Sequence, residues 1–134
     1  MGAWGTGPFD NDDAVDFAAS LDDLEPEDRP NAIREALAEA AAETDYLERD
    51  AGGAAVAAAA LVAAQYPDGE PIDSVYGPKQ SIPDLPEELK PIAVQALTRV
   101  LADDSELNEL WADSPDGEAW FTMVAQLAEV LTAV

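Results

Sequence analysis

Apolar side chains recur along the chain at intervals of three and four residues, the spacing of amphipathic α-helices. The first such stretch follows Asp10, which we expect to cap the helix, with Asp12 and Asp13 favourable in its first turn. A second helix is predicted to begin near Pro30, because proline suits a first helical turn, with Asp28 as its cap. The apolar positions of these two helices are Ala14, Phe17, Ala18, Leu21, Ile33, Ala36, Leu37, Ala40 and Ala41.

A third helix is predicted from its cap, Asp50, to about Gln65. Residues 54–64 of this helix are alanine, interrupted only by Val56, Leu61 and Val62. Small side chains on every face let neighbouring helices come close. We therefore expect this helix to be central and largely buried.

Three more helical stretches follow toward the C-terminus. The first covers about residues 86–102 and contains Pro91, so this helix either starts late or is bent in its first turns. A short helix capped by Asp104 or Ser105 follows, and the pair Ser114-Pro115 signals the start of the last helix. The apolar faces of the two final helices carry Leu107, Leu110, Trp111, Trp120, Phe121, Val124, Leu127, Ala128 and Leu131, and we expect both tryptophans to pack in the core.

Two stretches lack a helical period. Residues 1–9 contain three glycines, one proline and two aromatic residues, which indicates an ordered turn segment. Residues 67–85 contain four prolines and two glycines, which exclude a long helix but leave room for a short extended piece at residues 72–76. So long a loop in a compact domain is often functional or mobile. The prediction is one all-α domain over residues 1–134, an irregular bundle of five to six helices around the alanine-rich helix.

The balance of charges restricts the partners. The formal net charge is −23, from 29 carboxylates against six scattered basic residues. Affinity for nucleic acid rests on Lys and Arg at phosphates, so direct binding of DNA or RNA is not expected, and anionic membranes are excluded for the same reason. No basic region precedes an apolar run, and the apolar stretch at residues 51–64 is too short to span a bilayer, so we expect a cytoplasmic protein.

The chain contains neither cysteine nor histidine. Thiolate chemistry, a Ser-His-Asp triad, a Cys-His dyad and an ordinary zinc site are therefore impossible within it. No pair among the 29 carboxylates can be selected as catalytic, and the sequence predicts no catalytic residue, cofactor or metal ligand set.

The candidate surface residues cluster near the N-terminus. Trp4 and Phe9 either form an aromatic ligand pocket beside Asp10 and Asp12 or cover the open end of the bundle. Lys79 in the long loop is a separate candidate for contacting a partner.

A cation site is the alternative use of the same N-terminal carboxylates, which are Asp10, Asp12, Asp13 and Asp16. Their spacing fails the calcium-loop pattern, because Ala14 and Val15 stand where a further ligand and a glycine belong. Helix capping explains this cluster more simply.

The segments Met1-Gly2-Ala3-Trp4-Gly5-Thr6-Gly7-Pro8-Phe9-Asp10-Asn11-Asp12 and Ala14-Val15-Asp16-Phe17 resemble a bacterial family, the one catalogued as domain of unknown function 4259. The resemblance returns at Val100-Leu101-Ala102-Asp103-Asp104-Ser105-Glu106-Leu107, at Glu109-Leu110-Trp111 and in the Trp120 helix. It implies one intact domain over nearly the whole chain, and it carries over no activity, ligand or catalytic residue.

The acidity has three interpretations: a solvated surface, adaptation to high salt, or recognition of a basic partner. Nine carboxylates fall within residues 10–28 and seven within residues 103–118, and they would form one negative face if the first and last helices packed together. The leading hypothesis is a non-catalytic binding module for a basic protein, for example an inhibitor or immunity protein against a basic toxin or nuclease. The alternatives are an enzyme using carboxylates or a divalent metal, and a self-associating structural protein; the oligomeric state is left open.

Overall fold

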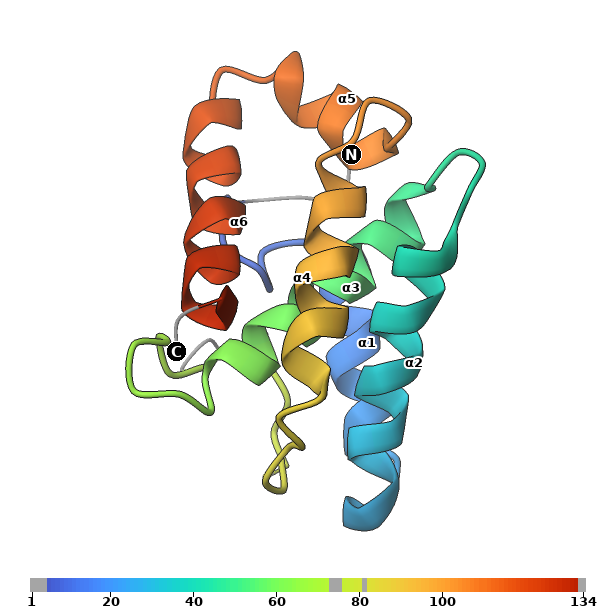
Figure 1. Ribbon diagram of the computed structural model, residues 1–134, viewed down its shortest axis with the longest axis vertical. Helices are drawn as coiled ribbons and strands as arrows, with labels where there is room; N and C mark the ends of the chain where they lie inside the picture. Colours follow the sequence, from blue (N-terminus) through green and yellow to red (C-terminus); the bar gives the residue numbers. More distant parts are fainter. Residues whose placement is uncertain (1–4, 73–75, 81, 133–134) are drawn as a thin grey trace.

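The computed structural model describes residues 5–72, 76–80 and 82–132. Within these residues the chain forms six α-helices and no strand, apart from an isolated bridge between Leu47 and Ser105. The helices are α1 (Asp12–Asp22), α2 (Arg29–Ala42), α3 (Arg49–Ala63), α4 (Leu89–Val100), α5 (Glu106–Ala112) and α6 (Gly117–Thr132), and a 3₁₀ turn at Pro26–Asp28 precedes α2 (Figure 1). The predicted all-α class is confirmed.

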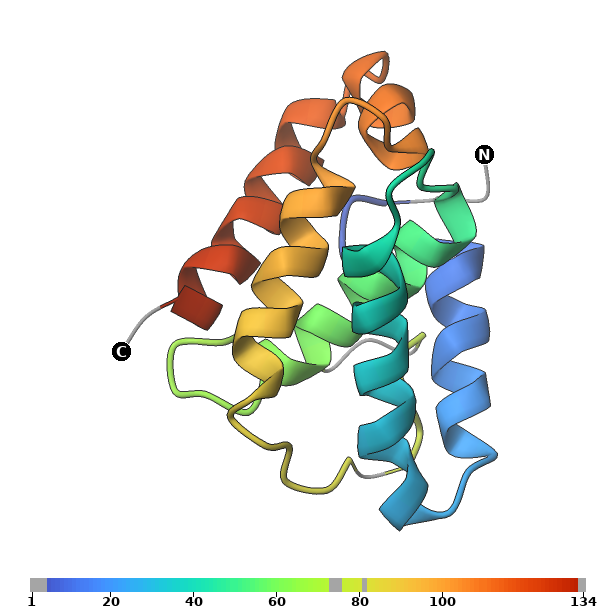
Figure 2. The ribbon, with the colours of Figure 1, turned by 45° about the vertical axis from the view of Figure 1, so that its right-hand side comes forward.

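The alanine-rich α3 lies at the centre of the bundle. It packs against α1, α2, α4, α5 and α6, and in Figure 2 it crosses obliquely behind the row formed by α6, α4, α2 and α1. Its residues from Ala55 to Ala63 are all buried, as are Gly52 and Gly53 near its start. Side chains no larger than a methyl group over most of the helix let five neighbouring helices approach it, and this is why α3 was predicted to be central.

The first two helices begin differently from the prediction. Asn11, not Asp10, caps α1, since its side-chain oxygen accepts a hydrogen bond of 2.9 Å from the backbone N–H of Ala14. Asp28 has helical backbone angles at the end of the 3₁₀ turn, and its side chain makes no capping hydrogen bond to α2. The tight turn brings the chain into α2 without a side-chain cap.

The start of α3 is capped from another part of the chain. The helix begins at Arg49, and Glu106 of α5 accepts a hydrogen bond of 2.8 Å from the Arg49 backbone N–H. The predicted cap, Asp50, lies inside the first turn instead, where its charge still favours the positive end of the helix.

The C-terminal helices resolve the other boundary questions. α4 begins at Leu89, so Pro91 lies in its first turn, where it needs no bend in the helix. Ser105 caps α5 through a hydrogen bond of 3.5 Å from the N–H of Asn108. α6 begins at Gly117, later than predicted, because Ser114 first closes a turn. The Ser114 hydroxyl accepts a hydrogen bond from the N–H of Asp116, and its carbonyl accepts one from the N–H of Gly117.

The described parts of the long loop, residues 67–72, 76–80 and 82–85, contain no helix, as expected. The extended piece predicted at residues 72–76 includes residues 73–75, which lie outside the described residues. No helix in the described part of the chain is both long and apolar enough to cross a membrane.

Candidate functional site

One cavity on the described surface is a half-open groove of about 630 Å³. It lies between α6, the C-terminal half of α3, the loop that follows α3, and the N-terminal segment at residues 7–10. In Figure 2 the C-terminal part of α6 lies close to this loop. The volume falls in the range typical of ligand pockets.

The walls and floor of the groove are largely apolar. From α6 come three side chains at helical spacing, Met123, Leu127 and Val130, and all three are half-buried. Their spacing places them on one face of the helix, toward the loop. The other apolar lining residues are Pro8, Phe9, Ala60, Ala63, Pro71 and Ile72.

The rim of the groove is acidic. Asp10 comes from the N-terminal segment, Asp68 and Glu70 from the loop, and Glu129 from α6. Asp68, Glu70 and Glu129 are exposed, and among the described residues no lysine or arginine lines the groove. The groove therefore combines an apolar floor with negative charge contributed by three separate segments.

Phe9 and Asp10 are the two predicted candidates that belong to this groove. Phe9 is only 2% exposed, so its ring packs in the core at the base of the groove. The carboxylate of Asp10 accepts a hydrogen bond of 3.0 Å from the N–H of Gly7. A Cβ at Gly7 would lie 2.8 Å from the same carboxylate oxygen, so a larger residue there would displace the Asp10 side chain.

Asp13 belongs to a different part of the surface. It forms an ion pair of 3.2 Å with Arg49 at the start of α3. Burial raises the pKa of Asp13 above its ordinary value; the charge of Arg49 offsets part of this effect, and Asp50 adds to it. This pair stands beside a cavity of only about 20 Å³, too small for anything but a water molecule.

The remaining candidates among the described residues line neither the groove nor the small cavity beside the Asp13–Arg49 pair. Asp12 and Asp16 are exposed on α1. Lys79 lies in the loop at the other end of α1, where its backbone N–H donates to both oxygens of Asp22 at 3.0 Å. Trp4 lies outside the described residues. The N-terminal carboxylates are thus distributed over several surfaces, and no three acidic residues in the described ranges are placed to share a metal ion.

The structure also keeps the first and last helices apart. α1 packs against α3, whereas α6 packs against α3, α4 and α5, and both views place α1 and α6 apart (Figures 1 and 2). The first and last helices therefore do not pack together, and the condition for a single negative face is not met. Within the described residues no Asp or Glu is buried.

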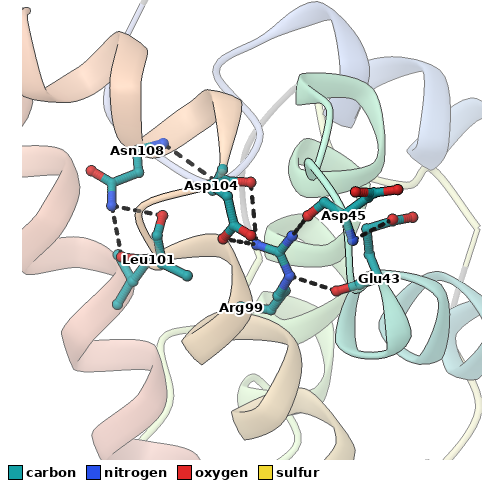
Figure 3. A network of polar contacts seen from close by, with 8 residues as sticks. Glu43, Asp45, Arg99, Leu101, Asp104 and Asn108 are labelled. Carbon is teal, nitrogen blue, oxygen red and sulfur yellow. Dashed lines mark hydrogen bonds and ion pairs between the residues drawn. The ribbon is translucent and has the colours of Figure 1, made fainter.

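Arg99 shows where the few positive charges are used. Its guanidinium donates to the backbone carbonyls of Glu43 and Asp45 after α2 and to the carbonyl and carboxylate of Asp104 (Figure 3). Beside it, the side-chain amide of Asn108 donates to the carbonyl of Leu101 at 2.7 Å. Arg99 thus joins the α2–α3 connection to the turn between α4 and α5.

Other basic side chains are used in a similar way. Arg29 is only 6% exposed and donates to the carbonyls of Leu21 and Leu24 at the end of α1, both at 2.9 Å. Arg34 pairs with Glu88, and the ammonium of Lys90 lies 4.3 Å from the centre of the Tyr66 ring.

The two core tryptophans, Trp111 and Trp120, are buried and stack with ring centres 5.6 Å apart.

Sequence reasoning missed most of the groove. Asp68, Glu70 and Glu129 were not singled out, although the loop was noted as long enough to be functional. One signal was available on α6: Met123 and Val130 extend its apolar surface beyond the face expected to enter the core. An apolar face wider than its helix neighbours can cover points to a second contact.

The family model described as "Domain of unknown function (DUF4259)" matches residues 2–123. The chain therefore belongs to this family, as its N-terminal and C-terminal motifs suggested. No curated protein and no solved structure matches the chain.

Proposed function

We propose that this member of a family of unknown function is a non-catalytic binding module for a basic protein partner. The observation that carries the proposal is the distribution of charge. Arg29, Arg34, Arg49, Arg99 and Lys90 each contact groups of the chain itself, while the described carboxylates lie at the surface. The net charge of −23 thus comes with no Asp or Glu buried among the described residues.

Such a surface affects the rate at which a partner associates. A strong field of one sign accelerates association with a protein of opposite charge and disfavours acidic competitors. Exposed pairs add little affinity individually, about 0–1 kcal/mol each, so a specific complex also needs apolar contacts. The groove supplies an apolar surface of suitable size, and inhibition of a basic toxin or nuclease is one role that fits.

Affinity capture from native lysate of the source organism tests this proposal. The immobilised chain should retain a basic protein at stoichiometric amounts, and the affinity measured with that purified partner should fall as salt increases. An unrelated acidic protein of similar net charge, immobilised in the same way, controls for simple ion exchange. The proposal fails if no basic protein is retained above this control, or if the affinity does not respond to salt.

The compartment proposed for this encounter is the cytoplasm. Fractionation of the source cells with an antibody against the chain checks it, and recovery of the protein outside the cytoplasmic fraction would contradict it.

A further inference from the structure

We infer that the groove between α6 and the loop after α3 binds a short cationic segment of the partner, with apolar side chains on its floor and lysine or arginine at its rim. This inference rests on the proposed function and specifies its site. The groove would recognise the amino-acid sequence of this segment, and the wider acidic surface would accelerate association with the partner.

The floor determines the apolar part of the ligand. Met123, Leu127 and Val130 lie at positions i, i+4 and i+7 of α6 and remain half-buried, so the helix presents a continuous apolar ridge that its own neighbours do not fully cover. Helix-and-groove recognition by peptides uses such ridges, into which two or three large apolar side chains fit. A cavity of about 630 Å³ has room for side chains of this kind.

The rim determines the charge of the ligand. Asp10, Asp68, Glu70 and Glu129 line the groove together with the apolar floor, and no basic side chain lines it in the described part of the chain. A neutral apolar segment would fit the floor but leave these carboxylates partly desolvated without partners. An acidic peptide or a nucleic-acid phosphate would meet charge of its own sign, whereas a lysine or arginine on either side of the apolar residues would meet a carboxylate.

A second copy of the chain is a poor occupant for the same reason. Each copy carries a net charge of −23, and its groove has an acidic rim, so docking of one copy on another brings like charges together. The chemistry of the rim thus favours a basic partner over self-association.

Three synthetic peptides and the full-length ¹⁵N-labelled chain test the inference. The probe peptide carries leucines flanked by lysines; in one matched peptide serine replaces the leucines, and in the other glutamate replaces the lysines. We expect the probe to shift the amide signals of Glu70, Leu127 and Val130. Each matched peptide should bind at least tenfold more weakly, which corresponds to about 1.4 kcal/mol.

Two double variants of equal charge locate the site. E70K/E129K reverses two exposed rim carboxylates, whereas E35K/E39K reverses two exposed carboxylates on α2, away from the groove. Both change the net charge from −23 to −19, so long-range attraction falls equally. We expect the rim variant to weaken binding of the probe peptide at least tenfold and the α2 variant to weaken it less than threefold.

The outcomes separate this inference from the proposed function. If both double variants weaken binding equally, if the leucine-free peptide binds as well as the probe, or if sedimentation shows that a second copy fills the groove, the inference is wrong. A basic protein captured from lysate would still support the proposed function in each of those cases. Conversely, peptide binding that maps to the groove without any captured basic partner would support the inference and leave the proposed function refuted.

Discussion

Replacing Arg99 by methionine should destabilise the protein far more than the same change at Arg34. Methionine keeps most of the apolar stem of the side chain but removes every donor. The Arg99 guanidinium serves three carbonyls and one carboxylate, and its side chain is 12% exposed, against 35% for Arg34, which pairs only with Glu88. The two variants change the net charge identically, so the comparison isolates local contacts.

The magnitude follows from these contacts. Hydrogen bonds from a charged donor contribute about 1.5–3 kcal/mol each when buried, but water can reach part of the Arg99 acceptors. We therefore expect Arg99→Met to lower the free energy of unfolding by about 2–3 kcal/mol in total. Exposed ion pairs contribute about 0–1 kcal/mol, which sets the expectation for Arg34→Met.

Urea denaturation followed by circular dichroism measures both changes on full-length protein. The slope of the transition should stay unchanged, so that the shifted midpoint reports stability alone. Thermal unfolding provides a second readout, in which Arg99→Met should lower Tm by several degrees. If the two variants differ by less than about 0.5 kcal/mol, the scatter usual for surface substitutions, Arg99 does not hold the helix ends together.

Three further predictions concern stability. A Cβ at Gly53 would lie 3.0 Å from the Cβ of Asp13, which cannot move without the backbone of α1, so Gly53→Ala should lose about 1–2 kcal/mol. A Cβ at Gly52 would lie 3.0 Å from Cδ1 of Leu107 and 3.7 Å from Cδ2 of Leu47, the ends of flexible side chains, so Gly52→Ala should cost less; equal losses in urea denaturation would contradict this. Burial raises the pKa of Asp13 in the folded state, so the contribution of its protonated form to stability is present below the ordinary pKa and is lost as pH rises through the folded value. Asp13→Asn should therefore stabilise the protein at pH 7, despite losing the pair with Arg49, and should bring no gain at about pH 3. A variant less stable than wild type at pH 7 would show that the pair with Arg49 dominates. Raising sodium chloride from about 0.01 M to 0.5 M should raise Tm, because screening relieves repulsion among the excess carboxylates, and an unchanged Tm would show that this repulsion is negligible.

The sequence predicts the helices well because their periods and breaks are local features. Alanine over most of α3 indicated its central place, and the structure buries it as expected. The starts of helices were less predictable where the stabilising group comes from elsewhere in the chain. Glu106 caps α3 from 57 residues away, and no local pattern around Arg49 could indicate this.

The candidate site was less predictable than the fold. Asp10, Asp12, Asp13 and Asp16 are close in sequence, but Asp10 precedes the cap of α1, whereas Asp12 and Asp13 are successive residues of the helix and point about 100° apart. Asp10 lies at the groove and Asp13 pairs with Arg49 on another surface. The groove itself combines residues of α3, α6, a loop and the N-terminal segment, and only the tertiary packing brings these together.

One test can separate an acidic surface kept for binding from one kept for solubility. E70K/E129K and E35K/E39K change the net charge equally, so we expect both to raise the free energy of unfolding to a small extent. If the rim carboxylates serve recognition, the rim variant gains stability and loses affinity for the basic partner, whereas the α2 variant gains stability and loses less than threefold in affinity. Such a trade between stability and function is typical of binding sites that concentrate charge of one sign. If both variants bind the partner as the wild type does, the rim carboxylates are ordinary solvated charges, and recognition lies elsewhere on the surface.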